Sequence, residues 1–157
     1  MKDIIYTKGD ATKPITTGNK IIVHVCNDVG GWGKGFVMAI SSKWAAPEKD
    51  YREWYKSKTN FSLGEIQLVQ VENDMWVANM IGQRNINKDE NGNPPVRYEA
   101  IESALQKVAV LASEKKASVH MPRIGCGLAG GKWEIMEPII IRSLSEKDIE
   151  VTVYDFG

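Results

Sequence analysis

Short apolar runs recur along the chain and are separated by polar segments rich in glycine and asparagine. The longest run, residues 20–26, is apolar at nearly every position, which is typical of a strand covered on both faces. Residues 65–73 alternate polar and apolar side chains, and residues 75–83 follow directly, a pattern that predicts an antiparallel hairpin. Shorter strands are expected within residues 3–10, 117–125 and 149–156.

Helical periodicity marks the other long segments. Residues 97–116 place their apolar side chains on one face at three- and four-residue spacing, and residues 133–144 form a last helix. Residues 36–56 also follow a helical pattern, which we expect to break near Pro47, because proline lacks an N–H and clashes with the preceding turn. The polar residues 84–96 are expected to form a surface loop. Strands alternate with helices after the hairpin, so we predict a three-layer α/β fold with a mixed central sheet.

Composition narrows the class of protein. The 157 residues are 43% hydrophobic and 25% charged, which is ordinary for one globular domain spanning 1–157. Twenty basic residues balance twenty acidic ones, which argues against non-specific nucleic-acid binding. Cys26 and Cys126 form no metal-type pair and favour free thiols in a reducing compartment. With no secretory leader and no apolar run long enough to cross a membrane, we expect a cytoplasmic protein. We also expect no bound metal and no cofactor.

Two glycine-rich segments follow apolar strands and precede helices. The first is "CNDVGGWGKGF" (residues 26–36), and the second is "PRIGCGLAGGKW" (residues 122–133). In open α/β sheets, ligands sit beyond the carboxyl ends of the strands, so we expect the two loops to face each other across one crevice. Backbone N–H groups of such loops and the helix N-termini that follow bind anions, and two loops together could hold a diphosphate. Neither segment matches a Walker loop or a G-x-G-x-x-G motif. The alternative is that both are ordinary structural loops.

These segments together resemble the macro domain family. The resemblance rests on "KGD" after the first strand, "HVCNDVGGWGKGF" after the second, "MPRIGCGLAGGKWE" later, and the closing "VTVY", and it covers essentially the whole chain. It is similar to the branch that contains the ADP-ribose 1″-phosphate phosphatases and the glycohydrolases that release ADP-ribose from glutamate. The implied fold is a three-layer α/β/α macro domain, and the implied ligand is ADP-ribose or one of its derivatives.

The resemblance also implies individual contacts. Asp10 corresponds to the carboxylate that accepts a hydrogen bond from the adenine amino group, and Asn27 to the asparagine near the distal ribose. Trp32 is expected either to wall one side of that ribose or to pack on the adjacent helix. The ligand-binding positions implied in this way are Asp10, Gly31, Trp32, Gly33, Gly35, Ile124, Gly125, Cys126, Gly127, Leu128 and Phe156.

The chain departs from the glutamate-specific glycohydrolases at two positions. Those enzymes use a lysine and an aspartate, where this chain has Gln83 and Ala129. Because neither side chain can act as nucleophile or general base, we do not expect that mechanism. A phosphatase or deacylase mechanism stays open, since it needs a positioned water and donors that stabilise developing anionic charge.

Three residues are candidates for positioning that water. Asn27 is expected to orient a ribose hydroxyl or the water itself. Asp28 either positions the water or caps its own loop. His24 is either catalytic or a hydrogen-bonded core histidine of its strand, and His120 is a less favoured candidate because it precedes the second loop.

The expected function is therefore hydrolysis of a distal-ribose substituent, on ADP-ribose 1″-phosphate or a related ADP-ribose conjugate. The first alternative is a non-catalytic reader of free or protein-linked ADP-ribose. An ADP-ribosylated protein is a further expected partner, whereas direct nucleic-acid and membrane binding are not expected. The intact glycine loops argue against a third alternative, a vestigial cleft.

Overall fold

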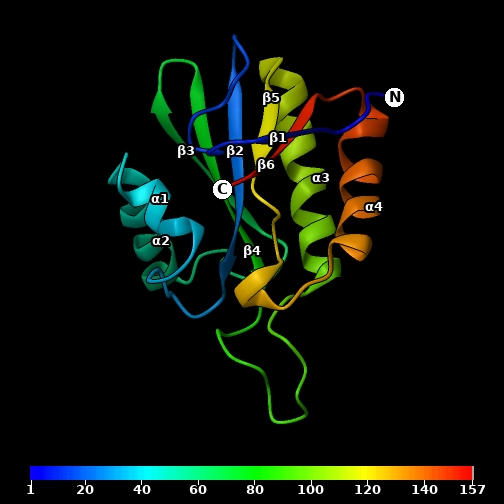
Figure 1. Ribbon diagram of the computed structural model, residues 1–157. Helices are drawn as coiled ribbons and strands as arrows, with labels where there is room; N and C mark the ends of the chain where they lie inside the picture. Colours follow the sequence, from blue (N-terminus) through cyan, green and yellow to red (C-terminus); the bar gives the residue numbers. More distant parts are fainter. Residues whose placement is uncertain (157) are drawn as a thin grey trace.

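A computed structural model describes residues 1–156 of the chain (Figure 1). Its strands and helices alternate largely as the sequence predicts. The strands are β1 (Ile5–Lys8), β2 (Lys20–Asn27), β3 (Ile66–Glu72), β4 (Met75–Gln83), β5 (Ser118–Met121) and β6 (Val151–Asp155). The helices are α1 (Phe36–Ser41), α2 (Ala46–Ser57), α3 (Tyr98–Lys115) and α4 (Trp133–Ser143), with short 3₁₀ turns η1 (Gly127–Ala129) and η2 (Ser145–Lys147). No helix of the described residues is long and apolar enough to cross a membrane.

The six strands form one mixed sheet in the order β1-β6-β5-β2-β4-β3. Neighbouring strands from β1 to β4 pair in parallel, and β3 pairs antiparallel with β4, as expected for the predicted hairpin. In the central strand β2 every residue except Val25 is buried, which explains its nearly continuous apolar sequence. Because five strands run in parallel, their carboxyl ends meet at the same edge of the sheet.

Helices cover both faces of the sheet, so the fold is the predicted three-layer α/β/α arrangement (Figure 1). The apolar faces of α3 and α4 pack on one side, around Ile101, Leu105 and Ile140, which are all fully buried. The helices α1 and α2 cover the other side, around Ile40 and Tyr51. The sheet therefore lies between two hydrophobic cores, and the carboxyl ends of its parallel strands carry the loops.

The predicted break near Pro47 is confirmed, but its cause differs from the one expected. The helical pattern of residues 36–56 breaks at residues 42–45, before Pro47, and Pro47 lies in the first turn of α2. A proline at this position loses nothing by lacking an N–H, because the first N–H groups of a helix have no intrahelical acceptor. The proline therefore starts the second helix instead of interrupting one long helix.

Candidate active site at the carboxyl edge of the sheet

Segments far apart in sequence meet where the parallel strands end. β1 leads into Asp10, β2 ends at Asn27, β4 ends at Gln83, β5 leads into Pro122, and β6 leads into Phe156. This edge collects both glycine-rich loops, as the strand–loop–helix pattern predicts. The site is therefore a product of the topology, and each of its segments is positioned by a strand of the sheet.

The side chain of Asn27 organises the first glycine loop. Its Oδ1 accepts hydrogen bonds from the N–H groups of Val29 (3.0 Å) and Gly31 (2.9 Å), and its Nδ2 donates to the carbonyl of Gly31 at 2.9 Å. The Tyr51 hydroxyl of α2 donates to the carbonyl of Asn27 at 2.6 Å. Gly35, at φ 84, turns the chain into α1 with a backbone conformation that favours glycine. Asn27 is thus largely engaged within its own loop, and one of its two amide hydrogens is left for a ligand.

The second glycine loop closes on itself before it enters η1 and α4. Gly125 and Gly127 have φ values of 72° and 67°, which an L side chain rarely adopts. The N–H of Gly131 donates to the carbonyl of Gly125 at 2.7 Å, so the loop returns past its own beginning. This tight return exposes Leu128 at its tip, with 71% of the residue accessible to solvent.

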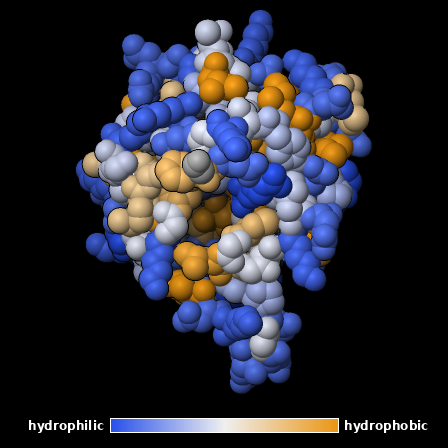
Figure 2. All heavy atoms as spheres, in the orientation of Figure 1, coloured by the Kyte–Doolittle hydropathy of each residue, from blue (hydrophilic) through white to orange (hydrophobic). Residues whose placement is uncertain are grey.

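A cavity of about 300 Å³ lies between the two loops. Residues 34–37 line it from the first loop and residues 122–129 from the second, with His24, Val25 and Gln83 from the strands. Leu128 Cδ1 lies 3.6 Å from where a Cβ on Gly35 would stand, so the loops approach each other closely. Figure 2 shows a hollow with a hydrophobic floor near the centre of this face, between the positions that α1 and η1 occupy in Figure 1.

Backbone donors around this cavity are available to a ligand. Among the described residues, the N–H groups of Gly35, Gly127 and Leu128 donate to no other protein group. Unpaired N–H groups in a concave glycine-rich site are the usual means of binding a phosphate or carboxylate. The arrangement can therefore hold an anion without a cluster of basic side chains, which agrees with the zero net charge of the chain.

Asp10 presents one free carboxylate oxygen at the β1 end of the same edge. Its Oδ1 accepts hydrogen bonds from the N–H and the hydroxyl of Thr12, at 2.8 and 2.7 Å, and its Oδ2 accepts none within residues 1–156. Partial desolvation raises the pKa of Asp10, but the two Thr12 bonds and the nearby Lys13 and Lys43 outweigh it and hold the pKa below its ordinary value. Asp10 is therefore ionised at neutral pH and has one oxygen available as an acceptor.

His24 of β2 and Trp32 of the first loop are both buried. His24 is 2% exposed, and its Nε2 lies 2.5 Å from Oδ1 of Asn79. Burial lowers the pKa of His24 to about 4, partly offset by the Asn79 bond. The indole of Trp32 is 5% exposed, donates to the Ser41 hydroxyl at 2.7 Å and does not line the cavity. Trp32 therefore packs on the adjacent helix, whereas His24 is a hydrogen-bonded core histidine that also lines the cavity.

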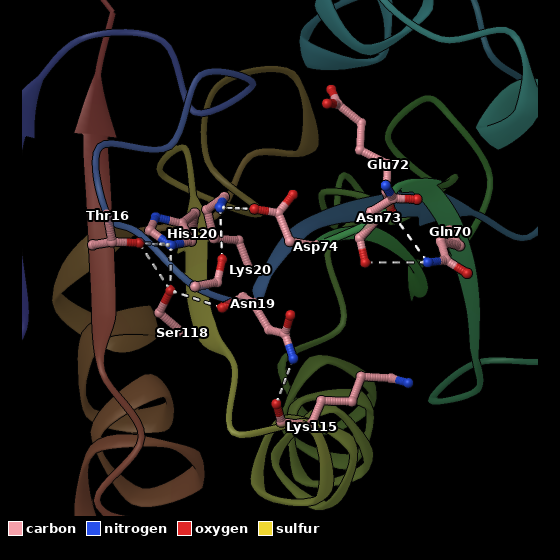
Figure 3. Close-up of polar contacts among 11 residues, drawn as sticks. Thr16, Asn19, Lys20, Gln70, Glu72, Asn73, Asp74, Lys115, Ser118 and His120 are labelled. Atoms are coloured by element: carbon pink, nitrogen blue, oxygen red, sulfur yellow. Dashed lines mark hydrogen bonds and ion pairs between the residues drawn. The ribbon is translucent and has the colours of Figure 1, made fainter.

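The remaining polar candidates differ in their surroundings. Asp28 accepts a hydrogen bond from the N–H of Asn85 through Oδ1 at 2.7 Å, so it caps a neighbouring loop and keeps Oδ2 free within the described residues. His120 lies away from the cavity: its ring nitrogens contact the hydroxyls of Ser118 (2.7 Å), Thr16 (3.1 Å) and Tyr154 (2.8 Å), the first two of which Figure 3 shows. Burial and, less strongly, the nearby Lys20 lower the pKa of His120 to about 4. His120 is therefore part of a buried polar network behind the site.

Of the predicted ligand contacts, six line the cavity, namely Gly35, Ile124, Gly125, Cys126, Gly127 and Leu128. The other predicted ligand contacts lie at the same edge of the sheet without lining it, namely Asp10, Gly31, Trp32, Gly33 and Phe156. Of the three catalytic candidates, His24 lines the cavity, whereas Asn27 and Asp28 do not. Gln83 and Ala129, the two departures from the glycohydrolase pattern, both line the cavity. The missing lysine and aspartate are therefore replaced at positions that face the site.

Arg123 has a role that sequence reasoning missed. Its Nε and Nη2 donate to the two carboxylate oxygens of Asp155 at 2.7 and 3.0 Å. Its guanidinium carbon lies 5.2 Å from the ring centroid of Tyr6 and 4.9 Å from that of Trp133, so two aromatic rings hold the arginine in place. Arg123 thus clamps the start of the second loop to β6, β1 and α4. The only sequence signal was its position within "MPRIG".

Comparisons with known proteins agree with this geometry. A solved structure of a protein of unknown function from Bacteroides thetaiotaomicron is 61% identical, covers 98% of each chain and superposes with a TM-score of 0.97. The ADP-ribose 1″-phosphate phosphatase of Lodderomyces elongisporus is 26% identical over 96% of this chain and 98% of its own length. The mouse chromodomain-helicase-DNA-binding protein 1-like is 31% identical over 98% of this chain, which spans only 18% of that relative.

The family model for the macro domain matches residues 23–140, which include most of β2, both glycine loops and most of α4. This match covers more than half of the 157 residues. The strand order, the two glycine loops and the cavity between them agree with this match. The chain therefore belongs to the macro domain family.

Proposed function

We propose that this macro domain binds ADP-ribose in the cavity between the glycine loops and hydrolyses the bond to a substituent on the distal ribose. ADP-ribose 1″-phosphate is the proposed substrate, and other conjugates at the same carbon are the wider class. The observation that carries the proposal is the set of unpaired N–H groups from both loops around one cavity of about 300 Å³. A relative spanned over nearly its whole length is named as a phosphatase of this compound.

The proposed ligand runs along the carboxyl edge of the sheet. Its adenine lies at the β1–β6 end, where Asp10 Oδ2 accepts a hydrogen bond from the adenine amino group. Phe156, which is 88% exposed, covers the base. The diphosphate lies against residues 124–128 and the distal ribose against the first glycine loop. The order of the strands supports this orientation, because β1 and β6 lie on one side of β5 and β2 on the other.

The chemistry proposed at the distal ribose uses few side chains. Water attacks the 1″-phosphate, the bond from phosphorus to the sugar oxygen breaks, and the products are ADP-ribose and inorganic phosphate. Asp28 Oδ2 would hold the attacking water, the remaining amide hydrogen of Asn27 would orient a ribose hydroxyl, and loop N–H groups would stabilise the developing charge. His24 is not a base in this scheme, because its Nε2 is engaged by Asn79 and its ring is buried.

The second candidate function is a reader that binds ADP-ribose without turnover. One observation favours it: Asn27, Asp28 and His24, the three catalytic candidates from the sequence, each already make a hydrogen bond that holds a loop or a strand in place. A reader needs the cavity and its donors but no positioned water.

Phosphorus NMR of the protein mixed with ADP-ribose 1″-phosphate separates these functions in one sample. Release of inorganic phosphate that an Asp28→Asn variant slows supports the phosphatase. Shifted diphosphate resonances without release favour the reader or a hydrolase of another conjugate. Unshifted diphosphate resonances would contradict both functions, because the proposed cavity would then hold no diphosphate.

A further inference from the structure

A second cavity lies at the amino end of β5, at the opposite edge of the sheet from the glycine loops. Its volume is about 440 Å³. The end of α3 and the start of β5 line it, together with Thr16 and Thr17 from the connection between β1 and β2. No residue lines both this cavity and the cavity between the glycine loops, so the two are separate.

Ser118 of β5 lines this second cavity and contacts a buried histidine. Ser118 and His120 are two residues apart in one strand, so their side chains lie on the same face of the sheet. Ser118 Oγ lies 2.7 Å from Nε2 of His120, and the other ring nitrogen, Nδ1, lies 2.8 Å from the Tyr154 hydroxyl. A serine hydroxyl, an imidazole and a third group on the far ring nitrogen form the arrangement that activates serine nucleophiles.

The surroundings of His120 suit the role of a base. Burial and, less strongly, the nearby Lys20 lower the pKa of the ring to about 4, so the imidazole is neutral at neutral pH. In the tautomer that donates from Nδ1 to Tyr154, the lone pair of Nε2 faces Ser118. Thr16 Oγ1 lies 3.1 Å from Nε2 and 3.0 Å from Ser118 Oγ, and Figure 3 shows these three side chains pointing toward one another. Ser118 makes the shorter contact with the imidazole and is therefore the favoured nucleophile.

Backbone donors lie beside the serine. Within residues 1–156, the N–H groups of Thr16 and Thr17 donate to no other protein group, and both residues line the cavity. Unpaired N–H groups next to a nucleophile can stabilise the negative charge that develops on a carbonyl oxygen during acyl transfer. The cavity therefore combines a nucleophile, a base and candidate donors for an oxyanion.

The charge at the cavity indicates what kind of ester would enter it. Lys2, Lys116 and Lys147 line it and outnumber its two carboxylates, those of Asp148 and Glu150. None of the three ammonium groups has a hydrogen bond or an ion pair within the described part of the chain. A substrate with a negative charge of its own would be attracted to them.

We propose that this cavity is a second active site, which hydrolyses carboxylic esters that carry a further negative charge, with Ser118 as the nucleophile and His120 as the general base. The proposal does not depend on ADP-ribose binding at the other edge of the sheet.

The proposed reaction has two steps. Ser118 Oγ attacks the carbonyl carbon of the ester while its proton passes to Nε2 of His120, and the N–H groups of Thr16 and Thr17 bind the oxyanion. The bond from the carbonyl carbon to the alcohol oxygen then breaks, and the alcohol leaves with the proton from Nε2. Water attacks the acyl-serine and gives a proton to Nε2, which returns it to Ser118 Oγ as the carboxylic acid is released.

The test uses a covalent probe and two chromogenic esters on the full chain. A fluorophosphonate reacts with activated serine hydroxyls, and peptide mass spectrometry then locates the label. Hydrolysis of p-nitrophenyl hydrogen succinate, which is anionic, is compared with hydrolysis of the neutral p-nitrophenyl acetate. The variants are Ser118→Ala and His120→Gln. Ser113→Ala is the matched control, because Ser113 lines the same cavity but contacts no histidine.

The fluorophosphonate should label Ser118 of the unaltered protein, and His120→Gln should slow the labelling by about 100-fold. Ser118→Ala should lose the label and the hydrolysis of the succinate ester, whereas Ser113→Ala keeps both. The kcat/KM for the succinate ester should exceed that for the acetate by about tenfold.

Several results would overturn the proposal. The first is an unlabelled Ser118 in the unaltered protein, a result that requires no variant to fold. The second is undiminished ester hydrolysis by Ser118→Ala. The third is inhibition of that hydrolysis by saturating ADP-ribose, because the reaction would then take place between the glycine loops. Equal kcat/KM values for the two esters would overturn the assignment of an anionic substrate.

Discussion

Asp10 divides its two carboxylate oxygens between the protein and the proposed ligand, and this division allows a sharp test. Oδ1 accepts both hydrogen bonds from Thr12, whereas Oδ2 accepts none within the described residues. An Asp10→Asn variant can keep Oδ1 toward Thr12 and places an NH₂ donor where Oδ2 was. The variant therefore preserves the loop and reverses the polarity at the adenine position.

The expected magnitude follows from that reversal. A hydrogen bond to a charged group contributes about 1.5–3 kcal/mol, so its loss should weaken ADP-ribose binding by roughly 10- to 150-fold. The hypoxanthine analogue, inosine diphosphate ribose, carries a carbonyl acceptor in place of the amino group. It should lose little affinity on the same substitution, because the asparagine NH₂ can donate to that carbonyl.

Calorimetry with both ligands on the native and variant proteins gives the coupling energy between residue 10 and the base. Any other difference in affinity between the two ligands is the same on both proteins and therefore cancels. Thermal unfolding serves as the control for folding, and Asp10→Ala, which also loses both Thr12 bonds, should be less stable than Asp10→Asn. If Asp10→Asn changes the two affinities by the same factor, Asp10 does not contact the base, and the proposed orientation of the ligand is wrong.

Three further predictions test other parts of the site. Gly33→Val should weaken ADP-ribose binding without lowering the melting temperature, because a Cβ at Gly33 meets no protein atom within 4 Å; unchanged affinity in calorimetry would contradict it. Arg123→Ala should weaken ADP-ribose binding by about tenfold, because the second loop loses its clamp. Arg142→Ala, which breaks a similar two-bond pair with a carboxylate on the surface, is its control, and equal effects of the two substitutions would refute the clamp. The lowered pKa values of His24 and His120, each about 4, mean that only the unfolded chain takes up these protons between about pH 6.5 and 4. Each histidine therefore contributes roughly 3 kcal/mol to the free energy of unfolding above that window, and this contribution is lost as the pH falls through it. Imidazole NMR resonances of the folded protein that titrate near pH 6.5 would contradict this prediction.

The fold could be predicted because its signals are local. The continuous apolar run of β2, the alternation of β3 and β4, and the one-sided periodicity of α3 each depend on neighbouring residues alone. The same local signals placed both glycine loops directly after strands, and parallel pairing then brings those loops to one edge. The break near Pro47 was predicted with the wrong cause, because a proline tolerated in a first helical turn and a proline that breaks a helix look alike in sequence.

The roles within the site could be predicted less well because they depend on distant partners. Whether Asn27 is free for a ligand depends on Tyr51, which reaches it from α2. Whether His24 is catalytic depends on Asn79 of the neighbouring strand. Trp32 is surrounded by glycines in sequence, yet its indole is buried and bonded to Ser41 of α1. Tertiary contacts of this kind leave no pattern in a single sequence.

The central claim, that ADP-ribose binds between the two glycine loops, is tested most directly by following backbone amide resonances of the protein during titration with ADP-ribose. The account predicts shifts at Gly35, Gly127 and Leu128, with no change at Ser113 and Lys116, which line a separate cavity beside the C-terminal end of α3. Shifts confined to that second cavity, or no shifts in either place, would contradict it.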